Sequence, residues 1–103
     1  MTVLQIEHDF ELPLGYVDED GNLHKTGTMR LATAADEVLP MRDPRVQQNP
    51  SYLSIIILSR VVVKLGSLKM VTPRTVENLF TKDFNYLQRM YSQINGVDDN
   101  SEN

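Results

Sequence analysis

Two histidines and their neighbouring carboxylates are the first residues of this chain that could do chemistry. His8 and His24 both lie in the N-terminal quarter, and Glu7 and Asp9 flank the first of them. If this segment folds back on itself, the two imidazoles could face one another beside a carboxylate. A zinc site needs three or four converging ligands, and the chain has no cysteine to complete such a set. We therefore interpret the histidines as solvated hairpin side chains and predict neither a metal nor a cofactor.

Other patterns that carry chemistry are incomplete. Residues 18–22, Asp-Glu-Asp-Gly-Asn, resemble the start of a calcium loop, but the later bidentate glutamate is missing at the required spacing. We interpret them as a turn. No serine stands in the glycine context of a nucleophile elbow, and the five glycines are too scattered for a phosphate-binding loop. The sequence thus predicts no catalytic residue, and we expect a protein that is not an enzyme.

The elements that must position these residues begin with an extended segment. Phe10, Leu12 and Leu14 alternate with Glu11 and Pro13, and this period of two in the apolar residues predicts a strand. An Asp-Gly pair then supplies a tight turn, and an extended return follows. We predict an antiparallel β-hairpin over residues 8–31, preceded by an N-terminal arm at residues 1–7. A lone hairpin is marginal in water, so it should pack on helices or pair with another chain.

The most apolar segment of the chain is residues 53–65, where nine of thirteen side chains are large and aliphatic. Asn49-Pro50 is a helix-start signal, and Gly66 stands where a helix often ends. We therefore predict a central apolar helix over residues 50–65. The six β-branched residues within it leave two short strands as the alternative. A helix that is apolar on nearly every side must be covered by the rest of the chain or by another chain.

Further helix signals lie on both sides of this segment. Thr33 can cap a helix that Pro40 ends early, and Thr72 followed by proline predicts another short helix. A last helix carries an apolar stripe and ends near residue 95. The expected fold class is α+β: an N-terminal antiparallel β-hairpin followed by a small bundle of three to four helices at residues 32–96. Residues 97–103 are acidic and polar, and we predict that this tail is disordered.

Charge and composition limit the classes of partner. The net charge is −4, with six acids and no lysine or arginine in residues 1–24. The ten cations are spread over the later part without a dense cluster, so we expect a solvated surface and no nucleic-acid partner. The apolar run is too short to span a bilayer, which takes about 20 residues. With no signal-peptide layout and no cysteine, we expect a cytoplasmic protein with no membrane partner.

A resemblance to a known family extends over about residues 8–95. The segments that carry it are residues 10–21 (FELPLGYVDEDG), 29–37 (MRLATAADE), 42–46 (RDPRV), 52–62 (YLSIIILSRVV) and the closing stretch 79–95. Together they resemble the phage tail assembly protein or tail assembly chaperone family, of the type associated with phage-like contractile injection systems. The resemblance implies an assembly factor that binds a tail tube, tape-measure or baseplate protein, and it supplies no catalytic residues.

The hairpin and the apolar segment are the expected contact regions for such a partner. The candidate partner-binding residues are Phe10, Leu12, Tyr16, Tyr52, Leu53, Ile56 and Val63. Apolar faces left uncovered would also leave room for a homo-oligomer. Two alternatives remain open. One is a structural tail or baseplate subunit that stays in the particle, and the other is a small DNA-binding regulator built on the C-terminal helices.

Overall fold

The N-terminal hairpin forms as the alternation predicts. The computed structural model describes residues 4–96, so the predicted tail at residues 97–103 lies outside the described residues. Strand β1 (Glu7–Val17) pairs antiparallel with β2 (Leu23–Arg30). A third strand, β3 (Val62–Leu65), adds to β2, which gives a three-stranded antiparallel sheet in the order β1-β2-β3. The α+β class is confirmed, with a sheet one strand wider than predicted.

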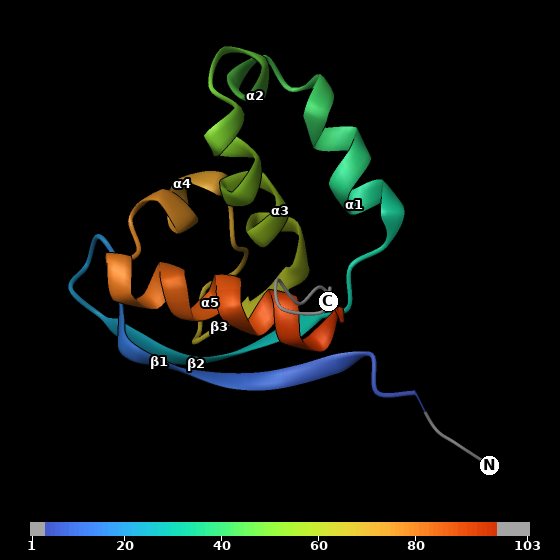
Figure 1. Ribbon diagram of the computed structural model, residues 1–103. Coiled ribbons are helices and arrows are strands. Elements are labelled where there is room, and N and C mark those ends of the chain that lie inside the picture. Colours follow the sequence, from blue (N-terminus) through green and yellow to red (C-terminus); the bar gives the residue numbers. More distant parts are fainter. Residues whose placement is uncertain (1–3, 97–103) are drawn as a thin grey trace.

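Helices and 3-10 turns make up most of the remaining fold (Figure 1). In chain order they are α1 (Ala34–Val38), η1 (Leu39–Arg42), α2 (Pro44–Gln48), η2 (Pro50–Tyr52), α3 (Leu53–Val61), α4 (Pro73–Glu77) and α5 (Thr81–Ile94). The longest, α5, crosses one face of the sheet and contacts β1, whereas α2 lies at the opposite end of the molecule. Short helices therefore surround α3 on the side away from the sheet.

The predicted central helix over residues 50–65 begins where Asn49 and Pro50 place it, as a 3-10 turn that leads into α3, but its predicted end is wrong. A 3-10 turn occupies residues 50–52, and the α-helix ends at Val61, after which the chain becomes β3. The β-branched valines at this point favour an extended backbone, and β2 offers a free ladder to pair with. The Gly66 N–H donates to the carbonyl of Thr26 at 2.7 Å. Gly66, with φ 54°, thus ends a strand and not a helix.

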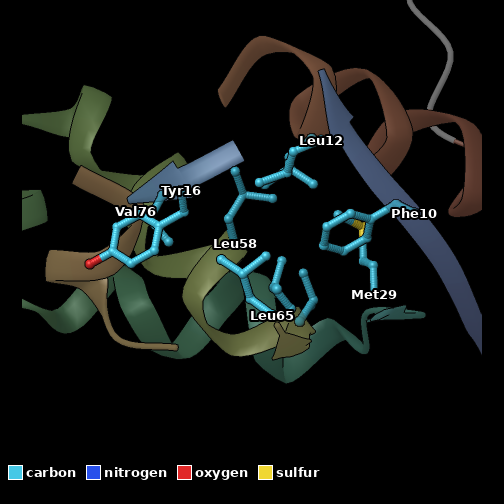
Figure 2. Packing of buried hydrophobic residues seen from close by; sticks show 10 residues of the cluster. Phe10, Leu12, Tyr16, Met29, Leu58, Leu65 and Val76 are labelled. Carbon is cyan, nitrogen blue, oxygen red and sulfur yellow. The ribbon is translucent and has the colours of Figure 1, made fainter. Parts of the chain in front are cut away.

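One apolar core lies between the sheet and the helices (Figure 2). Its buried members are Phe10, Leu12, Tyr16, Met29, Leu58, Val61, Val62, Leu65, Val76 and Leu87. They come from all three strands and from α3, α4 and α5. Full burial of one such side chain contributes about 1.5–3 kcal/mol, so this cluster is the main source of stability. It includes four of the nine large aliphatic residues of the segment 53–65.

Gly27 allows β3 and the Phe10 ring to lie close to the backbone of β2 in the middle of the sheet. It pairs with Phe10 on one side and Leu65 on the other. A Cβ at this position would lie 2.3 Å from the carbonyl oxygen of Lys64 and 2.6 Å from the Phe10 ring. A side chain here would therefore push β3 and the aromatic ring away from β2.

Candidate protein-interaction surface

Four of the seven predicted partner-binding residues belong to the core. Phe10, Leu12, Tyr16 and Ile56 are between 1% and 9% exposed. The alternation of β1 turns the first two inward beneath the helices, and Ile56 lies on the buried side of α3. In this fold their side chains are not available to a partner. The prediction identified apolar residues correctly but did not separate those that face the chain's own core.

The other three candidates are only partly available. Val63 in β3 is 47% exposed, and Tyr52 and Leu53 are half-buried. The Tyr52 hydroxyl donates to the carboxylate of Glu77, and the Arg45 guanidinium lies 5.2 Å from its ring centroid. Tyr52 is thus held between α2 and α4 of its own chain. Of the seven residues, Val63 is the one that clearly reaches the surface.

A more exposed apolar surface lies where α1 passes into η1. Val38, Leu39 and Met41 are 56%, 45% and 56% exposed, and they are nearly consecutive in sequence. Pro40, which is buried, ends α1 and turns the chain into the 3-10 geometry of η1. We call these three exposed side chains the α1–η1 patch. From the sequence, Pro40 predicts only the end of a helix, and the exposure of the Val-Leu-Pro-Met run around it does not follow from that signal.

Asp36 fastens the α1–η1 patch to the body of the protein. Its carboxylate is 2% exposed. It accepts two hydrogen bonds from Arg30 in β2, at 2.7 and 3.0 Å, and one from Arg60 in α3, at 2.9 Å. It also accepts from the backbone N–H of Thr33, which closes a capping box at the start of α1. The hydrogen bonds from Arg30 above all, with those from Thr33 and Arg60, hold the pKa of Asp36 well below its usual range despite burial.

The histidines are in different environments, which corrects the prediction that both are solvated. His24 is 5% exposed. The Ser67 N–H donates to its Nδ1 at 3.2 Å, so Nε2 carries the proton and donates to Asp18 at 2.8 Å. His8 is half-buried, and its Nε2 lies 3.2 Å from the carbonyl oxygen of Gln5. His8 thus bonds within its own segment, whereas His24 also links β2 to Ser67, which follows β3. Residues 4–96 contain no group of three or more histidine and acidic residues placed to hold a metal ion.

The acidic loop of residues 18–22 is a turn built around Asp18. One carboxylate oxygen accepts from the backbone N–H groups of Asp20 and Asn22, both at 2.9 Å, and the other meets His24. The hydrogen bond to His24, with those from the turn, lowers the pKa of Asp18 to about 2. Its oxygens are therefore already satisfied by the chain itself, as in other aspartate-stabilised turns.

The start of the last helix is fixed to the hairpin by a buried aspartate. A helix-turn-helix reader places the first residues of its second helix against bases in the major groove. Here Asp83, in the first turn of α5, is fully buried and accepts from the backbone N–H groups of Leu14 and Gly15 in β1. The start of α5 is therefore docked on the hairpin. Of its exposed cationic residues, Lys82 lies in the first turn and Arg89 two turns further along.

Comparisons with family models, with curated proteins and with solved structures find no match to this chain. Within residues 4–96, none of the helices is both long enough and apolar enough to cross a bilayer.

Proposed function

We propose that this protein is an assembly factor or chaperone for a phage-like contractile tail or injection system. It binds a tail tube, tape-measure or baseplate subunit in the cytoplasm, before that subunit polymerises, and it acts by contact and not by catalysis. The sequence resemblance over residues 8–95 supports this role. The structural observation that carries it is the α1–η1 patch, because adjacent large apolar side chains on a surface mark a site for another protein.

The hydrogen bonds that fix the α1–η1 patch in place favour a role in binding another protein. Asp36 is bonded to Arg30 and Arg60, which come from the sheet and from α3. The short helix α1 is thereby fixed in place although Asp36 is its one buried residue. A partner meets side chains whose backbone is already ordered, so less conformational freedom is lost on binding than at a flexible loop.

Co-expression with tail proteins encoded nearby tests the proposal. The tagged protein should co-purify with a tail tube, tape-measure or baseplate subunit, and it should keep that subunit from aggregating. The double variant Val38→Ser, Met41→Ser should lose the partner while its melting temperature stays close to that of the wild type. Met70→Ser is the matched control, since Met70 is 68% exposed but lies outside the patch. If no tail subunit co-purifies with the wild-type protein, the proposed function is wrong.

The alternative is a structural subunit that stays in the tail or baseplate. The same patch would then be a permanent interface, so the surface alone does not separate the two roles. Mass spectrometry of purified particles separates the two roles. A fixed copy number in the finished particle favours the structural subunit, and its absence from particles favours the assembly factor.

A further inference from the structure

The outer edge of β1 carries backbone groups without a partner strand. In the described part of the chain, residues 4–96, β1 is the first strand of the order β1-β2-β3 and pairs only with β2. The N–H of Leu31 donates to the carbonyl of Ile6 at 2.7 Å, so that position is a hydrogen-bonded pair. In an antiparallel ladder such pairs alternate with pairs whose N–H and C=O groups point the other way. Glu7, Asp9 and Glu11 therefore direct their backbone groups to the free edge.

The other side of β2 gives the same result independently. The Thr26 carbonyl accepts from Gly66 beside β3, so Thr26 points away from β1. Its register partner in β1 is Glu11, which must point to the free edge as well. Among residues 4–96, one hydrogen bond uses these edge groups: the Gln5 amide donates to the Glu7 carbonyl at 3.1 Å. The edge is thus an open template for a further strand.

The side chains of the same three residues determine which strand fits. Glu7, Asp9 and Glu11, which we call the acidic row, are all exposed on the sheet face away from the core. Little of their negative charge is neutralised by neighbouring residues. Asp9 accepts a hydrogen bond from the uncharged Thr28 hydroxyl at 3.0 Å, and the Glu11 carboxylate lies 3.9 Å from the Lys25 ammonium group. Two copies of β1 paired antiparallel would place acid against acid, and like charges directly opposite are destabilising. The acidic row therefore opposes self-pairing and favours a basic strand.

Residues on the opposite face of an added strand would meet α5. A surface hollow of about 320 Å³ lies between the start of β1 and this helix. Its lining is mixed. Tyr86, Met90 and Ile94 are half-buried and supply the apolar part, and His8, Asp9, Arg89 and Gln93 supply the polar part. Side chains of a strand alternate between faces, so a segment added to β1 would present every second residue to this hollow and the others to the acidic row.

We propose that the free edge of β1 binds an extended segment of the tail subunit in which basic residues alternate with apolar ones. The backbone of that segment pairs with Glu7–Glu11, its lysine or arginine side chains face the acidic row, and its apolar side chains enter the hollow beside Tyr86. This inference rests on the proposed function for the identity of the partner. The alternation of basic and apolar residues in that segment is inferred from the free edge, the acidic row and the hollow, and this part is independent of the proposed function.

A synthetic peptide of seven alternating lysine and valine residues, capped at both ends, is the probe. Its addition should slow hydrogen exchange at the amides of Glu7, Asp9 and Glu11, measured by NMR, while exchange in α3 is unchanged. A peptide with glutamate in place of lysine should not bind. Asp9→Lys should weaken binding about tenfold, equal to about 1.4 kcal/mol. The matched control Asp20→Lys makes the same charge change in the exposed turn and should leave the affinity within about twofold.

The outcomes separate this inference from the proposed function. If the lysine peptide gives no protection at the three amides, or if Asp9→Lys and Asp20→Lys weaken it equally, the edge site is wrong. The tail subunit could still bind the wild-type protein through the α1–η1 patch, and the proposed function would stand. If the peptide protects the edge as expected but no tail subunit binds, the site is real and the proposed function is wrong.

Discussion

Replacement of Asp83 by alanine should remove the strongest polar link between the last helix and the hairpin. The carboxylate is fully buried and accepts from the N–H groups of Leu14 and Gly15 at 2.8 and 3.0 Å. A hydrogen bond to a charged group contributes about 1.5–3 kcal/mol. Leu14 is 46% exposed, so water can replace part of the loss at its N–H, whereas Gly15 is buried. We expect a loss of about 3 kcal/mol in the free energy of unfolding.

For a chain of this size that loss corresponds to a fall of about 15 °C in melting temperature. Urea unfolding followed by circular dichroism measures the free energy directly. Asp83→Asn should fall between wild type and alanine, because the amide keeps one acceptor but turns its NH₂ toward the second N–H donor. Asp20→Ala is the control, since that side chain is exposed in the turn. If Asp83→Ala unfolds within about 0.5 kcal/mol of the control, the buried link contributes little and our reasoning about the hairpin is wrong.

Three further predictions concern the core, the response to acid and the end of β3. Leu58→Ala should cost about 3 kcal/mol in urea unfolding, because Leu58 is 2% exposed and its removal leaves a cavity. Val63→Ala, at an exposed position, should cost less than about 0.5 kcal/mol. The lowered pKa of Asp36 means that its carboxylate stabilises the fold above about pH 4 and that this contribution is lost as the pH falls further. Asp36→Asn should therefore be less stable at neutral pH but show a shallower loss of melting temperature below pH 4. Gly66→Ala should destabilise more than an exposed Gly21→Ala, because its Cβ would lie 2.2 Å from Nδ1 of His24. Equal melting temperatures for these two glycine variants would contradict the packing seen here.

Local patterns were enough to predict the hairpin. The period of two at Phe10 and Leu12 and the Asp-Gly turn both act over a few residues, and β1 and β2 formed where these signals place them. The end of α3 could not be found in this way. The valines after Ser59 suit a helix or a strand, and the choice depends on β2, which is more than thirty residues away in sequence. Pairing between β2 and β3, which are far apart in sequence, therefore determined where α3 ends, and the local helix-end signal at Gly66 did not.

The candidate surface was predicted less well than the fold, for a related reason. Hydrophobicity identifies residues that avoid water, but it does not say whether the chain's own core or another protein covers them. Phe10 and Ile56 are covered by the chain, whereas Val38 and Met41 are not. The difference depends on Pro40, where α1 gives way to η1, and on Asp36, which holds α1 through hydrogen bonds from Arg30 and Arg60. The β1 edge was partly foreseeable, because the acids of residues 7–11 alternate with inward-facing residues in the sequence itself.

Three buried polar groups connect the hairpin to the helical part of the protein at separate points. Asp83 binds the backbone of β1, His24 in β2 accepts from Ser67, and Asp36 binds both Arg30 and Arg60. Removal of one partner of a buried hydrogen bond leaves the other unsatisfied, so the hairpin cannot swing away from the helices without breaking several such bonds together. The free edge of β1 and the α1–η1 patch are therefore held on one rigid body. Under the proposed function, a subunit that contacts both would lose less conformational freedom on binding, because the relative position of the two surfaces is already fixed.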